Sequence, residues 1–306
     1  MIVATLKNTT VNDTGFLKLP VGTTAQRSGS PSDGEMRINS DTGYIECAYS
    51  GYWFNLYSVG YGQYITTGLY IHYDFSNPVC YSGSGTLVTD LASTQNGTIT
   101  GCSFSGSGNA KYLTFSSNGS TYVQMGSSVP AGQSTSALTM EAWIYTTALT
   151  GTNNSDGIGG IISSQNDGAS FRGASINTDT RSVAGGGPNG YHPQAGTGSG
   201  WLNVNGNTPS GSAAVSSRWD HVVTTWSTGN PLRTYENGSL LTADTNAPSV
   251  SINWGSTYWS LGRQLANSGY PRAYSGYIAI ARIYNTALSA SDVLYNFNGQ
   301  RGRFGV

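Results

Sequence analysis

Side chains that could act as acids, bases or nucleophiles are scarce in this chain. Its 306 residues include four glutamates and three histidines. Glycoside hydrolysis needs two carboxylates that flank the scissile bond. Glu141 has no acidic residue within two positions, and no Glu-x-Asp-x-x-Glu pattern occurs. The sequence therefore predicts a protein that is not an enzyme, with a glycoside hydrolase as the alternative.

The three histidines offer little for a Ser-His-Asp mechanism. No Gly-x-Ser-x-Gly sequence precedes a helical pattern, so no nucleophile elbow is indicated. His72 and His221 lie in apolar, strand-like runs, which favours packed structural roles. His192 lies in residues 189–193, interpreted as a loop, where a histidine can reach a ligand.

Aromatic and amide side chains make a better case, for sugar binding. Aromatic rings stack on sugar faces, and polar side chains hydrogen-bond to the hydroxyls. Long loops are frequent places for such sites. A Gly-rich stretch without phosphate-loop spacing supplies the candidate glycan ligands Tyr191, His192, Trp201, Asn203 and Asn205. A second aromatic set, around Trp254 and Trp259, is interpreted as core.

Alternating apolar residues indicate a β-scaffold for these side chains. Predicted strands are residues 69–75, 112–115, 122–125, 138–145, 219–226 and 276–284. Asn237-Gly238 predicts a type I′ hairpin turn. One helix is predicted, with Ser289 and Asp292 as a capping box and Gly299 at its end. The fold class is therefore all-β, with two packed antiparallel sheets.

Residues 1–62 differ from the rest of the chain and are assigned to a separate small β module. Turns punctuate predicted strands at residues 35–39, 44–48 and 52–56. A meander of this size buries little apolar surface alone. We therefore predict that residues 1–62 anchor or oligomerise the protein and that residues 63–306 form the sandwich.

The low content of charged residues makes some classes of binding partner unexpected. Charged residues make up 9% of the chain, against about 25% in an average globular domain, and the formal net charge is −1. No basic cluster precedes Arg301 and Arg303, so neither nucleic acid nor an anionic membrane is an expected partner. No apolar run is long enough for membrane insertion, and residues 1–8 lack signal-peptide features. The three cysteines are predicted to be free thiols, with a Cys80–Cys102 pair as the alternative.

Several short motifs follow one another in a fixed order between residues 67 and 289. They include Thr139-Met140-Glu141-Ala142-Trp143, Trp219-Asp220-His221-Val222, Tyr235-Glu236-Asn237-Gly238 and Leu261-Gly262-Arg263. In this order they resemble the laminin-G-like, concanavalin-A-like jelly-roll family, over about four fifths of the chain. The resemblance implies an antiparallel β-sandwich, a fold that hosts both carbohydrate binders and some glycosidases.

Both ends of the chain carry a second resemblance. Residues 21–27, followed by Arg37, Asn39 and Asp41, look like a short β module of phage virion proteins, although Ser28 stands where relatives usually have Pro. Residues 295–305 look like the C-terminal ending of phage and marine-virus laminin-G proteins. The resemblance implies a structural protein of a tailed-phage virion, either a tail fibre or other appendage or a capsid decoration. Such a protein would be made in the host cytoplasm and released by lysis.

The same resemblance implies partners and a metal. Residues 1–60 would contact other virion proteins of the capsid or tail, and copies of the chain in a homo-oligomer. The outward-facing sandwich would adhere to a host surface glycan; a dedicated receptor-binding lectin and a polysaccharide depolymerase are the alternatives. No cofactor is required, but laminin-G relatives often hold Ca²⁺ with oxygen ligands, which makes Asp156 and Asp167 candidate metal ligands.

Overall fold

Local β patterns divide the chain into two units, Met1–Val59 and Gly60–Val306. The computed structural model describes residues 18–41, 44–58, 63–126, 133–148, 157–164, 171–179, 190–203, 217–243, 249–255, 258–264 and 272–306. The first unit is a four-stranded sheet, here called sheet A, in the order β1–β2–β3–β4. Its elements are β1 (Val21–Gly22), the 3-10 helix η1 (Thr24–Gln26), β2 (Met36–Asn39), β3 (Tyr44–Tyr49) and β4 (Tyr52–Ser58).

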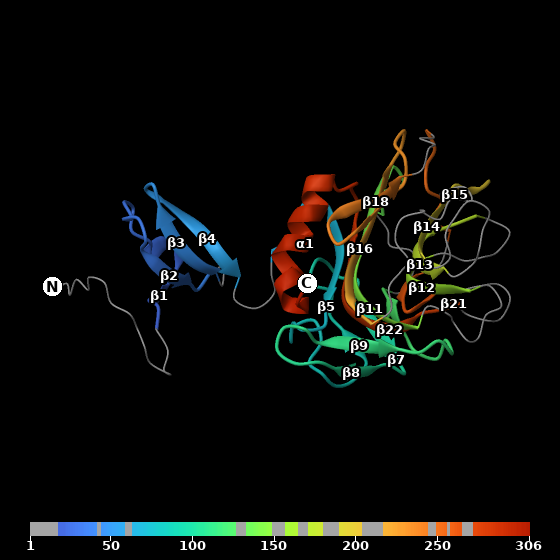
Figure 1. The fold of residues 1–306 in the computed structure, drawn as a ribbon, viewed down its shortest axis with the longest axis horizontal. Helices are drawn as coiled ribbons and strands as arrows, with labels where there is room; N and C mark the ends of the chain where they lie inside the picture. The colour runs from blue at the N-terminus through green and yellow to red at the C-terminus, as the bar shows by residue number, and fades with distance from the viewer. Residues whose placement is uncertain are drawn as a thin grey trace. The chain divides into compact units, whose positions relative to one another are not determined.

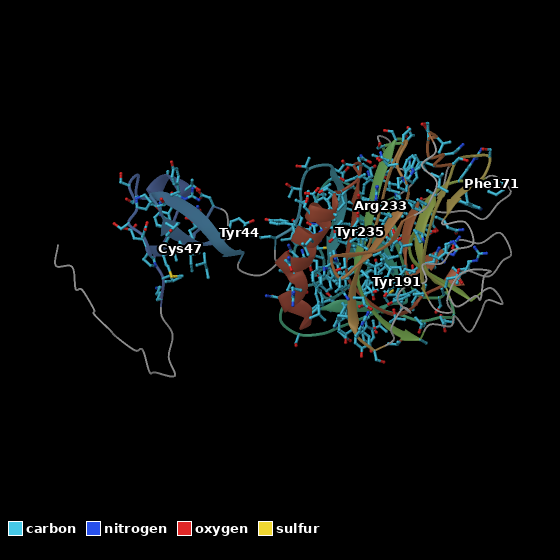
Figure 2. All side chains as sticks on the ribbon, turned by 45° about the horizontal axis from the view of Figure 1, so that its top comes forward. Tyr44, Cys47, Phe171, Tyr191, Arg233 and Tyr235 are labelled. Atoms are coloured by element: carbon cyan, nitrogen blue, oxygen red, sulfur yellow. The ribbon has the colours of Figure 1, made fainter. Side chains whose placement is uncertain are left out.

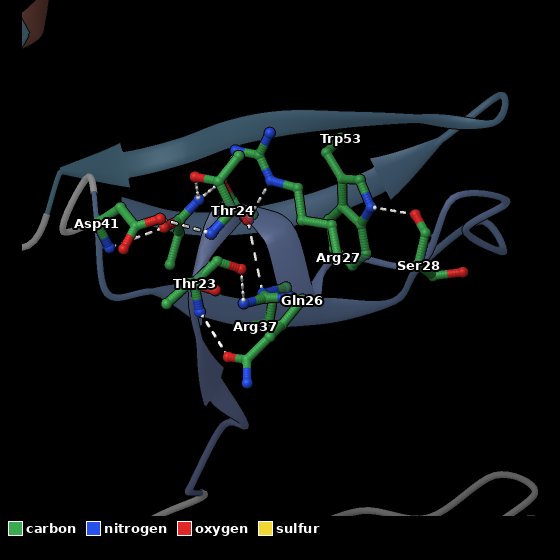
Figure 3. A network of polar contacts seen from close by, with 10 residues as sticks. Thr23, Thr24, Gln26, Arg27, Ser28, Arg37, Asp41 and Trp53 are labelled. Atoms are coloured by element: carbon green, nitrogen blue, oxygen red, sulfur yellow. Dashed lines mark hydrogen bonds and ion pairs between the residues drawn. The ribbon is translucent and has the colours of Figure 1, made fainter.

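A buried ion-pair network fills one face of sheet A (Figure 3). Glu46 is fully buried and binds Arg27 and Arg37. Asn39 Nδ2 donates to Glu46 Oε1 at 2.9 Å and to Thr24 Oγ1 at 3.0 Å. Burial alone would raise the pKa of Glu46, but the hydrogen bonds from Arg27 and Asn39 outweigh it and lower that pKa. Residues that carry the phage-module resemblance thus hold this unit together.

The second unit is a two-sheet β-sandwich with one helix on an outer face (Figure 1), which confirms the all-β prediction. Sheet B has the order β18–β17–β16–β11–β22–β9–β8, with β5 paired to β22. Its strands are β5 (Leu69–Asp74), β8 (Ser103–Ser105), β9 (Tyr112–Phe115), β11 (Ala137–Ala148), β16 (Trp219–Ser227), β17 (Arg233–Glu236), β18 (Ser239–Ala243) and β22 (Ser275–Tyr284).

Sheet C has the order β15–β14–β13–β12–β19–β10–β7–β6, with β20 and β21 beside β12. Its strands are β6 (Leu87–Val88), β7 (Gly97–Thr100), β10 (Tyr122–Met125), β12 (Ile158–Ser163), β13 (Ala174–Asp179), β14 (Gly190–Gly196), β15 (Trp201–Asn203), β19 (Trp259–Leu261), β20 (Arg263–Gln264) and β21 (Arg272–Ala273). The apolar core lies between sheets B and C and includes Trp254 and Trp259, as interpreted from the sequence.

Several local predictions are confirmed. Asn237 and Gly238 have φ values of 51° and 78°, as a type I′ turn between β17 and β18 requires. In β11, Leu138 and Met140 enter the core while Trp143 packs on the other face. Strand alternation therefore orients the central strand as its sequence indicates.

Residues 189–193 were wrongly predicted to be a loop, because residues 190–193 belong to β14; residues 197–200, also predicted to be a loop, form the connection between β14 and β15. Glycines and Pro193 give β14 a low strand propensity. The strand forms because it pairs along its length with β13, where Pro193 lies opposite Ile176. Tertiary pairing overrides local propensity here.

Helix α1 (Ala290–Phe304) begins as predicted and ends later than predicted. Ser289 Oγ accepts from the Asp292 amide at 3.2 Å, and Asp292 Oδ2 accepts from the Ser289 amide at 2.9 Å. The helix continues through Gly299 to Gly305, whose φ is 71°. A β-carbon at Gly299 would lie 2.3 Å from the Gln63 carbonyl oxygen, so this glycine allows a close contact and does not end the helix. Neither α1 nor any other helix in the described part of the chain is long and apolar enough to span a bilayer.

A carboxylate buried between sheet B and α1 binds four side chains. Glu141 Oε1 accepts from Arg282 Nη1 at 2.6 Å and is 2.9 Å from His221 Nε2. Its Oε2 accepts from Asn296 Nδ2 at 2.8 Å and from the Tyr284 hydroxyl at 3.2 Å. Burial alone would raise the pKa of Glu141, but the charge of Arg282 and the hydrogen bond with His221 lower it to about 2. The structural roles predicted for Glu141 and His221 are confirmed.

All three cysteines are free thiols, as predicted. Cys80 is buried, while Cys47 and Cys102 are half-buried. Burial raises the pKa of Cys80 and of Cys102 to about 12.

We expect Glu141→Ala to lower the free energy of unfolding of the sandwich by about 3–5 kcal/mol, because it leaves Arg282 buried without a counter-charge. Tyr284→Phe, the matched control, removes one neutral donor from the same carboxylate and should cost about 1 kcal/mol. Urea unfolding of both variants measures the difference. Equal losses would show that the ion pair does not dominate this contact.

We also expect the sandwich to lose stability as the pH falls below about 6.5. His72 is buried, and burial followed by the charge of Arg282 lowers its pKa well below the usual value. Protons then bind the unfolded chain and not the folded one, so stability falls by up to about 1.4 kcal/mol per pH unit. Melting curves between pH 8 and pH 5 should show this slope, and His72→Gln should flatten it. If the loss of stability per pH unit is the same in His72→Gln as in the parent, titratable groups other than His72 cause it.

Candidate functional site

The strands of sheet C carry apolar rows on the core side and polar rows on the other. The core-side register aligns five residues on neighbouring strands: Ile176, Ile162, Leu261, Val123 and Ile99. One position away, the register aligns a row of six polar residues: Gln194, Ser175, Ser163, Ser260, Gln124 and Thr98. Successive side chains of a strand point to opposite faces, so this polar row points away from the core.

Strands β13 and β14 add three side chains beside the polar row. His192 lies opposite Asn177 in the register, and His192 Nδ1 is 2.7 Å from Asp179 Oδ2. Asn177 Nδ2 donates to Ser175 Oγ at 2.9 Å and to the His192 carbonyl at 3.2 Å. The polar row together with Asn177, Asp179 and His192 is here called the polar face.

Two carbonyl oxygens of the polar face are buried without a hydrogen-bond donor among the described residues: Asn177 Oδ1 and Gln194 Oε1. Asn177 is 0% exposed and Gln194 is 8% exposed, so neither side chain is freely hydrated. An unsatisfied buried acceptor costs about 1–3 kcal/mol. A ligand that donates hydroxyl hydrogens would remove that cost.

Strand β20 borders the polar face at Gly160. A β-carbon at Gly160 would lie 2.4 Å from the Gln264 amide nitrogen, so only glycine allows this approach. The Arg263 guanidinium lies 3.2 Å from the centre of the Tyr122 ring and donates to the Tyr258 hydroxyl at 3.2 Å. The edge of the polar face at β20 thus combines the Arg263 guanidinium, held in place by two contacts, with the aromatic ring of Tyr122.

The structure places two of the five candidate glycan ligands, His192 and Trp201, on the polar side of sheet C, and it places the backbone of a third, Asn203, in β15. His192 is part of the polar face, Asn203 lies opposite Gln194 in the backbone register, and Trp201 lies opposite Gly196. Leu202, between the two β15 residues, enters the core, so Trp201 points outward; it is half-buried. The fourth candidate, Asn205, lies outside the described residues.

Tyr191, the fifth candidate, was wrongly placed in a ligand-binding loop. It lies in β14 and is 0% exposed, with its ring in the core between the sheets. Its hydroxyl donates to Asp220 Oδ2 at 3.2 Å. Neighbouring residues of a strand point to opposite faces, so His192 faces outward only because Tyr191 faces inward.

Sequence reasoning missed the polar residues of β13. The signal was present, because Ser175, Asn177 and Asp179 alternate with the core residues Ala174 and Ile176. A polar–apolar alternation of this kind predicts a strand with one polar and one apolar face.

The described residues present no group of three or more His, Cys, Asp or Glu side chains that could hold a metal. Asp179, the carboxylate of the polar face, is directed at a His192 nitrogen, whereas Ca²⁺ is bound by oxygen ligands alone. Asp156 and Asp167 lie outside the described residues. Calcium binding by those two residues stays a prediction.

Two antiparallel sheets, one covered by a helix and one with a polar outer face, place the second unit among the jelly-roll sandwiches. Residues 116–294 match the laminin G-type model of the concanavalin A-like lectin/glucanases superfamily. This match covers more than half of the chain, which belongs to that family. None of the curated proteins compared with the chain matches it.

Solved structures show the same fold at low sequence identity. Domain 4 of AbnA, a GH43 extracellular arabinanase from Geobacillus stearothermophilus in complex with arabinotriose, is 18% identical with a TM-score of 0.50, covering 74% of this chain and 96% of that domain. A receptor binding domain is 14% identical with a TM-score of 0.51, covering 76% and 51%. The binding domain of botulinum neurotoxin DC, in complex with SialylT, is 11% identical with a TM-score of 0.51, covering 76% and 52%. This chain spans about half the length of the latter two.

We expect Tyr191→Ala to destabilise the sandwich by about 3–5 kcal/mol, because it empties a fully buried ring site in the core. Tyr191→Phe keeps the ring and loses only the hydrogen bond to Asp220, at a cost of about 1 kcal/mol. Thermal unfolding of both variants measures the difference. A Tyr191→Ala protein as stable as the parent would place this ring outside the core.

Proposed function

We propose that this chain binds an uncharged glycan on the polar face of sheet C. The observation that carries the proposal is the pair of buried acceptors, Asn177 Oδ1 and Gln194 Oε1, beside a row of hydroxyl and amide side chains. Sugar hydroxyls donate to such acceptors, and the outward Trp201 offers a ring edge or face for stacking. The Asp179 carboxylate is paired with His192, which favours a ligand without charge of its own.

Binding is favoured over hydrolysis by the positions of the glutamates. Glu141 and Glu46 are fully buried in ion pairs, and Glu236 is bound to Arg218. Glu236 has a second carboxylate beside it, Asp220, but both are bound to Arg218 and are therefore engaged in ion pairs. We therefore propose a binding protein and not a depolymerase.

A glycan array with and without Ca²⁺ tests the proposal. We expect binding to neutral glycans, weakened about tenfold by Gln194→Ala and by Trp201→Ala, which corresponds to about 1.4 kcal/mol each. Val79→Ala is the matched control, since Val79 is 68% exposed and lies outside sheet C. No hits in either condition, or equal binding by all variants, would contradict glycan binding on this face. Release of reducing ends from a bound polysaccharide would instead favour the depolymerase.

We further propose that the chain is a structural protein of a tailed-phage virion, in which residues 1–60 contact other virion proteins and oligomerise. Support comes from the resemblance of residues 21–43 to a phage module, whose Arg27, Arg37 and Asn39 form one network in sheet A (Figure 3). Labelled antibodies on purified particles test this role by electron microscopy. Label on fibres would favour receptor binding, and label over the capsid a decoration role. Unlabelled particles would contradict the virion proposal and leave a free lectin.

A further inference from the structure

Sheet A has a second face that is apolar. Strand register and alternation place on it seven uncharged residues, here called the apolar face: Val21, Met36, Ile38, Ile45, Cys47, Tyr49 and Tyr52. Val21, Tyr49 and Tyr52 are 62%, 66% and 71% exposed. The sulfur of Cys47 projects from this unit (Figure 2). A large part of the apolar surface of the unit therefore faces outward.

The charged residues of the same strands point the other way. Arg37 and Glu46 alternate with Met36, Ile45 and Cys47 and belong to the ion-pair network. The apolar face therefore carries no charge in the described strands, and it needs no opposite charge on a partner.

The unit has little apolar interior of its own. Among its described side chains, Pro31 and Ala48 are the buried apolar groups. A sheet with one apolar face is stable when that face packs against another layer. The described part of the unit supplies no such layer over the apolar face.

The sandwich offers no matching sheet face in its described residues. The inner faces of sheets B and C pack on each other, α1 covers the outer face of sheet B around Trp143, and the outer face of sheet C is polar. Exposed large apolar side chains of the sandwich are spread over separate elements, such as Leu87 on β6 and Leu240 on β18. A second copy of the chain presents the same uncharged face, so it matches the apolar face in polarity and charge.

We propose that the apolar face of sheet A packs against the apolar face of a second copy of this chain. Because identical faces meet, the contact is isologous and gives a two-fold dimer. This inference deepens the proposed oligomerisation through residues 1–60 by naming its surface, and it does not depend on glycan binding.

Light scattering of the full chain during size-exclusion chromatography tests the contact. We expect twice the chain mass of 32.1 kDa for the parent, and the chain mass for Met36→Lys combined with Tyr49→Lys. Both sites are exposed, so the substitutions leave the fold intact, which circular dichroism checks. Val79→Lys combined with Leu87→Lys is the matched control and should remain dimeric.

A second measurement uses Cys47, which lies on the apolar face, as a probe. A short bismaleimide should link two chains of the parent and of Cys102→Ser, but not of Cys47→Ser. A monomeric parent, an assembly unchanged by the lysine pair, or cross-linking that survives Cys47→Ser would overturn the proposal. A glycan-binding protein that is monomeric would overturn this inference alone, whereas a dimer without glycan binding would overturn only the proposed function.

Discussion

The sandwich depends on one buried carboxylate. Glu141 of β11 binds side chains from β16, β22 and α1, so one residue fixes two neighbouring strands and the helix above them. Asn296 of the helix and Tyr284 of β22 both hydrogen-bond to the second carboxylate oxygen, which ties the helix to sheet B. Both Glu141 oxygens are hydrogen-bonded, whereas Arg282 Nε and Nη2 are buried without a hydrogen-bond partner among the described residues, so the pair is held mainly by its charges.

The outer faces of sheets B and C differ in the side chains that they carry. Sheet B carries the helix and the buried ion pairs, whereas the outer face of sheet C carries amides, hydroxyls and one Asp–His pair. The same alternation that fills the core with Ile162 and Leu261 places Ser163 and Ser260 outside. The same strand register therefore determines both the core packing and the candidate site. A shift of the pairing by one residue would turn the core side chains outward and the polar side chains inward.

Much of the fold could be predicted from the sequence because its signals are local. Ser289 with Asp292, and Asn237 with Gly238, specify a cap and a turn through their own backbone geometry. The candidate site could be predicted only in part. Strand β14 forms through pairing with β13, which no local pattern announces, and without that strand Tyr191 and His192 could not be assigned to opposite faces. The helix end was wrongly predicted at Gly299 for a similar reason. This glycine is required by a close contact with Gln63, which lies far away in the sequence.

The free thiols have a consequence for the covalent structure of the chain. Burial raises the pKa of Cys80 and Cys102 to about 12, so near neutral pH the reactive thiolate of each is on the order of 10⁻⁵ of the population. With no disulfide to form or lose among these three cysteines, the covalent structure is the same in reducing and in oxidising surroundings. The covalent structure of the sandwich is therefore independent of redox potential.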